Sequence, residues 1–251
     1  YSKKKKINLI STPFDFKSVD QLTKLKIPLF KISSGDLNNL PLIKYIAKKK
    51  KPIILSTGRS YLKEVDEAVN VIKSTGNKNF SILHCVSNYP AEFKDLNLRA
   101  ISTLSNNYKC KIGYSDHADG FEACLAAVSL GAKIIEKHIT LNKNMEGPDH
   151  KASMEPNEFH ELVKSIRKIE VGMGNGIKKP TKSEMLGRKN VRKSLFARKK
   201  IKKGEILSPT NLAIKRPGLG LSPKNYDRLL GCRARITINR DEMISWKKIK
   251  K

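Results

Sequence analysis

Two histidines stand at matching places in the chain, each directly after a short apolar segment. His117 closes the sequence GYSDH, and His138 closes the sequence IIEKH. If the two segments are neighbouring parallel strands, about 4.8 Å separates them, and the two imidazoles could hold one divalent cation. Asp116 and Glu136 stand beside the histidines and could orient the rings or act as additional ligands. The pattern also fits two histidines that are hydrogen-bonded inside a protein core.

A lysine and three serines form a second group of candidate site residues. Lys31, Ser34, Ser56 and Ser115 also stand at the ends of apolar segments. A cation combined with hydroxyl and loop N–H groups suits a bound phosphate or carboxylate. Serine in such a position is also typical of the cap of a following helix. The group therefore indicates an anion site, with helix capping as the alternative.

A third candidate lies in the sequence GPDHKAS, which contains Asp149. A carboxylate in a Gly-Pro loop could accept hydrogen bonds from sugar hydroxyls, and a simple turn is the alternative. The next step, Glu155-Pro156, predicts the start of a helix, because proline suits the first helical turn.

Short β-prone segments alternate with segments whose apolar residues have helical spacing. The expected strands are 7–11, 29–32, 53–56, 80–85, 110–114 and 134–138. This alternation predicts a parallel sheet with crossover helices. Polar residues at the end of almost every strand favour a (β/α)8 TIM-type barrel, whose site lies where the carboxyl ends converge. Because eight strands close such a barrel, we expect that its first two βα units precede Tyr1.

The pattern changes near Gly172, which predicts a division into domains. We expect a partial barrel over residues 1–172, a Gly- and Lys-rich linker over 173–187, and a small, mostly β domain over 188–251.

The composition bounds the class of protein. The formal net charge is +28, but lysines are spread along the whole chain and aromatic residues are only 6%, so we expect no nucleic-acid partner. No apolar run is long enough for a membrane helix, and we expect no membrane contact. Four scattered cysteines favour reduced, buried thiols in a cytoplasmic protein.

Six sequence motifs occur in order along the chain: KISSGDLNNLPLI, KPIILSTG, LHCVSNYPA, IGYSDH, EKHITL and GPDHKASMEP. They closely resemble the N-acetylneuraminate (sialic acid) synthase family, including enzymes that make legionaminic acid. The C-terminal part, with IKKGE and IKRPG, resembles the small antifreeze-like (SAF) domain of that family.

The resemblance implies an enzyme that condenses phosphoenolpyruvate with N-acetylmannosamine or a related N-acetylated hexose and releases phosphate. His117 and His138 would bind a divalent metal, typically Mn²⁺, with Mg²⁺ or Co²⁺ also possible, and would act in catalysis with Asp36 and Glu136. The metal would act as a Lewis acid on the aldehyde oxygen. The resemblance also implies phosphoenolpyruvate contacts from Thr12, Lys31, Ser34, Ser56 and Ser115, and sugar contacts from Tyr89 and Asp149. Arg216 would reach the partner's barrel in a domain-swapped homodimer.

Two alternatives remain open on the sequence alone. One is another phosphoenolpyruvate-dependent synthase that makes an ulosonate phosphate, although such enzymes do not usually carry a SAF domain. The other is a carbohydrate-binding or regulatory protein without catalysis. The family's first two βα units carry a phosphoenolpyruvate-binding lysine and a substrate-contacting glutamate. Because we expect those two units to precede Tyr1, we also expect the chain alone to be poorly soluble or inactive, and an N-terminally completed form to be active.

Overall fold

The computed structural model describes residues 1–250 and forms two compact units. The first unit is Tyr1–Asn175, and the second begins at Gly176. Each unit has its own buried apolar core.

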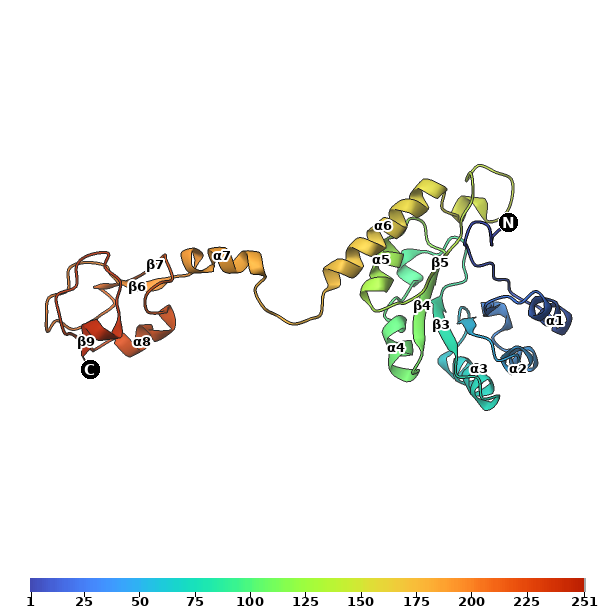
Figure 1. Ribbon diagram of the computed structural model, residues 1–251, viewed down its shortest axis with the longest axis horizontal. Coiled ribbons are helices and arrows are strands. Elements are labelled where there is room, and N and C mark those ends of the chain that lie inside the picture. Colours follow the sequence, from blue (N-terminus) through green and yellow to red (C-terminus); the bar gives the residue numbers. More distant parts are fainter. Residues whose placement is uncertain (251) are drawn as a thin grey trace. The chain divides into compact units, whose positions relative to one another are not determined.

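The first unit is built on a parallel sheet of five strands in the order β1-β2-β3-β4-β5. The strands are β1 (Phe30–Ile32), β2 (Ile53–Ser56), β3 (Phe80–Cys85), β4 (Lys111–Asp116) and β5 (Ile135–Lys137). Helices connect successive strands and cover the sheet (Figure 1). The predicted TIM-type architecture is confirmed as a curled half-barrel.

The prediction of a strand at residues 7–11 is wrong. The structure has no regular element there, and Ile7 and Leu9 are exposed. The N–H of Ile7 donates to the carbonyl of Ser2 within a local turn. Because a strand exists only where its backbone pairs with a neighbour, an apolar pattern alone does not form one.

The helices of the first unit have recognisable start signals. Asp15 accepts from the N–H of Ser18 before α1, and Asn39 accepts from the N–H of Leu42 before α2. The predicted helix start at Glu155-Pro156 is confirmed. The helices are α1 (Phe16–Lys24), α2 (Leu40–Lys48), α3 (Leu62–Ser74), α4 (Ala100–Asn107), α5 (Glu122–Ser129) and α6 (Pro156–Met173).

Strand residues alternate between two environments, as the period of two in a strand requires. Alternate residues such as Phe30, Leu55 and Ile82 are buried in the apolar core beneath the helices. The residues between them point to the opposite, inner face of the half-barrel. At the carboxyl ends of the strands, this inner face becomes polar.

The second unit is small and consists of short elements. They are α7 (Lys182–Val191), β6 (Ser194–Ala197), β7 (Leu212–Lys215), α8 (Tyr226–Leu229), β8 (Arg233–Ala234) and β9 (Ile249–Lys250). Strand β6 pairs antiparallel with β7, and β8 with β9. Helix α7 begins inside the expected linker, where Thr181 accepts from the N–H of Glu184 and the Glu184 side chain accepts from the N–H of Thr181. This reciprocal capping is a recognisable helix start.

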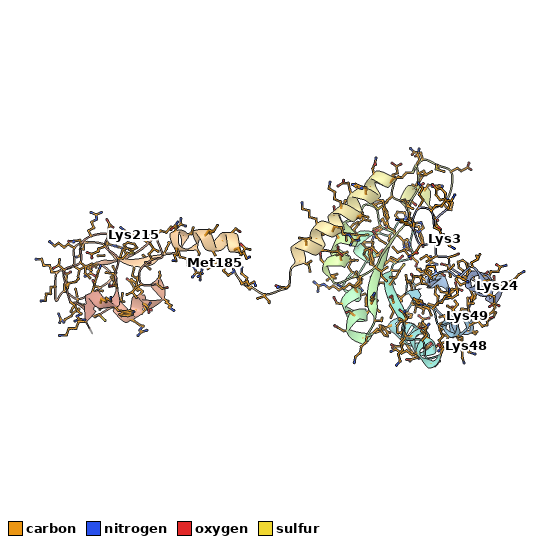
Figure 2. The ribbon with its side chains drawn as sticks, in the orientation of Figure 1. Lys3, Lys24, Lys48, Lys49, Met185 and Lys215 are labelled. Atoms are coloured by element: carbon orange, nitrogen blue, oxygen red, sulfur yellow. The ribbon has the colours of Figure 1, made fainter. Side chains whose placement is uncertain are left out.

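Lysine side chains project from both units (Figure 2). Lys24, Lys48 and Lys49 lie at the ends of α1 and α2, and Lys215 belongs to the second unit. Cys85, Cys124 and Cys232 are buried free thiols, and Cys110 is half-buried. Among the helices in residues 1–250, none is both long and apolar enough to cross a membrane.

Candidate active site

The polar ends of the strands surround one hollow of about 330 Å³ on the inner face of the half-barrel. Each of the five strands contributes one residue to the lining of this hollow, at a position that alternates with core residues. The lining consists of Lys31, Ser33, Ser34, Gly35, Ser56, Arg59, Cys85, Ser87, Tyr89, Ser115, His117, Glu136 and His138. Most of the predicted site residues therefore meet in one place.

A hydrogen-bonded network joins four strands at the base of this hollow. The ammonium of Lys31 donates to the hydroxyl of Ser56 at 2.8 Å and lies 3.4 Å from the carboxylate of Glu136. The hydroxyl of Ser115 donates to the same carboxylate at 2.7 Å. The Lys31 side chain is only 11% exposed, so its charge is held at a fixed position with little screening. The network gathers one ammonium, two hydroxyls and one carboxylate in the hollow, and the ammonium and the Ser56 hydroxyl are its donors for a bound anion.

His117 follows β4 and is almost fully buried. Its Nδ1 lies 2.8 Å from the carbonyl oxygen of Val86. Since a carbonyl can only accept, Nδ1 carries a proton, and in the neutral ring Nε2 has the free lone pair. Burial alone would lower the pKa of His117, but its contacts with the Cys85 sulfur and the Val86 carbonyl outweigh burial and raise the pKa overall.

His138 follows β5 and faces His117. The ring centroids are 5.3 Å apart, and the ring planes are inclined by 68°. Burial lowers the pKa of His138, and the neighbouring His117 lowers it further, so the ring is neutral at neutral pH. A carboxylate oxygen of Asp149 lies 3.9 Å from Nδ1 of His138. Asp149 is thus beside the histidine pair, although it does not line the hollow itself.

Tyr89 covers the histidine pair from one side. Its ring centroid lies 4.2 Å from that of His117 and 5.5 Å from that of His138. Burial raises the pKa of Tyr89, and the nearby charges of Cys85 and Asp149 raise it further. The phenol therefore remains protonated and can donate a hydrogen bond to a ligand.

The remaining predicted residues lie in different surroundings. The Ser34 hydroxyl lines the hollow and accepts from the N–H of Gly58 at 2.9 Å. Asp36 accepts from the hydroxyl of Ser33 at 2.9 Å and is not part of the lining. Thr12 is half-buried in the irregular stretch before α1, outside the lining. Arg216 is exposed and follows β7 in the second unit.

The hollow also contains residues that the sequence reasoning did not select. Arg59 donates to the carbonyl of Ser87 at 2.9 Å, and the sulfur of Cys85 lies 3.7 Å from Nδ1 of His117. Arg59 follows one predicted strand and Cys85 ends another, so their positions in the sequence pointed to the hollow. An arginine and a cysteine were not among the residue types that we expected there. A larger hollow of about 600 Å³ shares Arg59 and Cys85 but contains neither His117 nor His138.

The histidine pair fits a divalent metal. An imidazole nitrogen binds such an ion at about 2.1 Å, so two rings on one ion have centres roughly 5 Å apart. The observed 5.3 Å agrees with this value. The carbonyl bond at Nδ1 of His117 is the orienting contact that metal-binding histidines commonly make. Within residues 1–250, no group of three or more His, Cys, Asp or Glu side chains is arranged to hold a metal, so ligand or solvent oxygens would complete the coordination.

Comparison with known proteins assigns the chain to a family. A model of the NeuB family matches residues 1–178, and a model of the SAF domain matches residues 192–250. The chain belongs to the NeuB family. The predicted family resemblance, including the C-terminal SAF domain, is therefore confirmed.

Named NeuB relatives are similar over most of their length. The chain is 51% identical over 246 residues to N,N'-diacetyllegionaminic acid synthase of Campylobacter jejuni, a match that covers 97% of the chain and 74% of the relative. It is 37% identical to human N-acetylneuraminate-9-phosphate synthase, over 97% of the chain and 68% of the relative. The crystal structure of spore coat polysaccharide biosynthesis protein SpsE from Bacillus subtilis is 37% identical, with a TM-score of 0.67, and the match covers 99% of the chain and 75% of that protein.

Proposed function

We propose that this chain is a nonulosonic acid synthase that condenses phosphoenolpyruvate with an N-acetylated hexose and releases phosphate. One observation carries the proposal: the two imidazoles share a single hollow with Lys31, Ser56 and Ser115. A cation site beside an anion site suits a reaction that joins an anionic enol phosphate to an aldehyde. Membership of the NeuB family and the 51% identity to a legionaminic acid synthase support the same function.

Phosphoenolpyruvate would bind at the base of the hollow. Its carboxylate and phosphate need donors and a positive charge, which Lys31 and the Ser56 hydroxyl supply. The Ser115 hydroxyl, whose proton is donated to Glu136, lies beside them. Ser34 is on the same lining, and Arg59 adds a second positive charge at its border. The family resemblance adds Thr12 to this set.

The acceptor sugar would bind at the histidine side of the hollow. Tyr89 can donate from its protonated phenol, and the Asp149 carboxylate, which is half-exposed, can accept from sugar hydroxyls. The name of the 51% identical relative describes a product with two N-acetyl groups. We therefore favour a deoxy, diacetamido relative of N-acetylmannosamine over N-acetylmannosamine itself.

The chemistry requires control of charge and of protons. A divalent cation held by His117 and His138, Mn²⁺ or otherwise Mg²⁺ or Co²⁺, would supply Lewis acidity toward the aldehyde oxygen. The enol carbon C3 attacks the aldehyde carbon, the aldehyde oxygen gains a proton, and water adds at C2 with loss of one proton. Phosphate then leaves with the electrons of its C–O bond, while the new hydroxyl at C2 loses its proton and becomes the carbonyl. Glu136, fixed by Ser115 and Lys31, can take a proton from that water. Asp36 is a further acid–base candidate.

The working unit would be a domain-swapped homodimer in the cytoplasm. Residues 171–182 are exposed throughout, as expected of a connection between independent units. Arg216 is exposed on the second unit and free to approach a partner's hollow. Mixing an inactive Arg216→Ala variant with an inactive His138→Ala variant would restore part of the activity if the swap is correct, and would restore none if each site is complete within one chain.

The proposed function is tested by phosphate release from phosphoenolpyruvate with Mn²⁺ and three acceptors. These are the diacetamido sugar, N-acetylmannosamine and N-acetylmannosamine 6-phosphate, assayed with the 251-residue chain and with an N-terminally extended form. We expect release with the extended form, fastest with the diacetamido sugar, and a product mass equal to acceptor plus pyruvate. No release by either form with any acceptor would overturn the proposal.

The same assay separates the two competing functions. Turnover only with N-acetylmannosamine 6-phosphate would favour the activity in the name of the human relative, N-acetylneuraminate-9-phosphate synthase. Turnover only with a phosphorylated sugar that lacks the N-acetyl group, added as a fourth acceptor, would favour an ulosonate phosphate synthase, but the SAF domain match argues against that class. Sugar binding without turnover or metal requirement would favour a non-catalytic protein. The paired imidazoles argue against that function, because a site without catalysis has no need to keep two facing rings.

A further inference from the structure

A buried ion pair lies directly behind the two histidines. Asp116 and Lys137 are register partners on β4 and β5, with side-chain exposures of 0% and 1%. The ammonium of Lys137 donates to the carboxylate of Asp116 at 2.8 Å. Each residue is preceded and followed by residues that line the hollow, so the period of two turns both charged side chains away from it.

Every oxygen of the Asp116 carboxylate has partners. One oxygen accepts from the N–H of Ala118 at 3.0 Å and from the hydroxyl of Tyr114 at 3.1 Å. The other accepts from Lys137 and from the thiol of Cys124 on α5 at 3.1 Å. Lys137 also donates to the carbonyl of Ala118. The pair thereby joins β4, β5, α5 and the loop after His117 into one unit.

A buried ion pair is weak evidence for added stability. Replacing such a pair with two apolar residues of similar volume is often neutral or stabilising, because the ions must be removed from water. What a fully bonded pair adds is a fixed geometry between the elements that carry it. Here β4 and β5 are followed directly by His117 and His138.

We propose that Asp116 and Lys137 are positioning residues that set the spacing of the two imidazoles for a shared cation. Asp116 and Lys137 are the last paired residues of β4 and β5, so the ion pair fixes this end of the two strands. Each histidine is the next residue along the chain. The Ala118 contacts hold the backbone on the far side of His117 as well. Among the described residues, no hydrogen bond joins Asp116 to either imidazole. Asp116 would therefore act on the histidines through the backbone and not by orienting a ring directly. This positioning role rests on the proposed function, because a shared cation is part of that function.

The test measures Mn²⁺ binding by the loss of the free-ion electron paramagnetic resonance signal, independently of activity. The main variant is the double substitution Asp116→Asn/Lys137→Met, which removes both charges and leaves none unpaired. Circular dichroism melting first establishes that the variant is folded. We expect its Mn²⁺ dissociation constant to rise at least about tenfold, as for other residues that support metal ligands.

Two further variants keep the inference testable. Lys49→Met removes an ion pair of similar length, Lys49–Asp20 at 2.7 Å, directly after α2 (Figure 2), in which neither residue lines the hollow. It should leave the dissociation constant within about twofold of wild type. If the double variant does not fold, Tyr114→Phe removes one donor to Asp116 with little change of volume, and a rise of about threefold is expected.

The outcomes separate the inference from the proposed function. If wild type binds Mn²⁺ and the folded double variant, or Tyr114→Phe in its place, binds it equally well, the positioning role is overturned while the proposed function stands. If wild type binds no Mn²⁺, the proposed cation site is wrong and the positioning role falls with it. A selective loss in the variants, absent in Lys49→Met, supports the inference.

Discussion

The N–H at Nδ1 of His117 donates to the backbone carbonyl of Val86 at 2.8 Å. This bond fixes both the rotation of the ring and the position of its proton. The free nitrogen, Nε2, is the one available to a ligand. The loop after β3 thus orients the residue that follows β4. The pairing of β3 with β4 holds the loop and the histidine side by side.

If the histidine pair holds the cation, replacing either ring should abolish binding. We expect His117→Gln and His138→Gln to raise the Mn²⁺ dissociation constant by more than about a hundredfold, because each removes one of two protein ligands. The measurement is titration of the free-ion resonance signal. His160→Gln is the matched control, since His160 is exposed on α6 and should bind Mn²⁺ as wild type does. Unchanged binding in both site variants would contradict a shared cation.

Lys31 should act mainly on phosphoenolpyruvate. Lys31→Met removes the buried charge that donates to Ser56, and a hydrogen bond to a charged group contributes about 1.5–3 kcal/mol. We expect the KM for phosphoenolpyruvate to rise about 10- to 100-fold, with a smaller change for the acceptor sugar. Steady-state kinetics with each substrate varied in turn measures this. Lys44→Met, at an exposed position of α2, is the control; equal effects on both substrates in Lys31→Met would argue against a specific anion contact.

Gly113 is a place in β4 where no side chain fits. A Cβ atom there would lie 2.5 Å from a Leu83 methyl carbon and 2.5 Å from the carbonyl oxygen of Ile134. We expect Gly113→Ala to lower the free energy of unfolding of the first unit by about 1–3 kcal/mol through overpacking. Gly172→Ala in α6 is the control, because nothing lies within 4 Å of its Cβ, and should stabilise the helix slightly.

Urea unfolding followed by far-UV circular dichroism checks the prediction for Gly113. The only tryptophan, Trp246, lies in the second unit, so its fluorescence reports that unit separately. Its transition should be the same in wild type and Gly113→Ala. An unchanged circular dichroism midpoint would show that the strands can move apart without loss.

The sequence predicted the lining of the hollow well at positions on the strands. Lys31, Ser56, Ser115 and Glu136 were recognisable because a parallel sheet brings all carboxyl ends together and the period of two assigns the face. The histidine pair followed from the same rule. Asp36 and Thr12 lie in turns or irregular chain, where no periodicity fixes the direction of a side chain, and both fall outside the lining of the hollow.

Other features required the structure. The apolar pattern at residues 7–11 indicates side chains that favour burial, but it does not show which strand would pair with this segment. The expected strand is absent from the structure. Nothing in the sequence distinguished Lys137 from the other lysines, although its side chain is only 1% exposed. Only the register of β4 with β5 shows that it faces Asp116. The capping pair Thr181 and Glu184 also appeared only in the structure, where it begins α7 inside the stretch that we expected to be a linker.

The buried phenol of Tyr108 should make the first unit sensitive to alkali. Its hydroxyl donates to the carboxylate of Asp66 at 2.7 Å, and burial, followed by that bond, raises its pKa. An unfolded tyrosine releases its proton near pH 10, while the folded one keeps it. The contribution to stability is therefore complete below about pH 10 and is lost progressively above it, because only the unfolded state gains by ionising.

Tyr108→Phe isolates this effect. The variant lacks the hydrogen bond and should be less stable than wild type at pH 8, but the difference in melting temperature should narrow between about pH 10 and pH 11 as wild type loses its advantage. Circular dichroism melts at half-unit steps of pH measure the difference. Tyr61→Phe is the control, since that side chain is 83% exposed and should give no difference at any pH. A constant difference between Tyr108→Phe and wild type across the range would mean that the phenol ionises equally easily in both states.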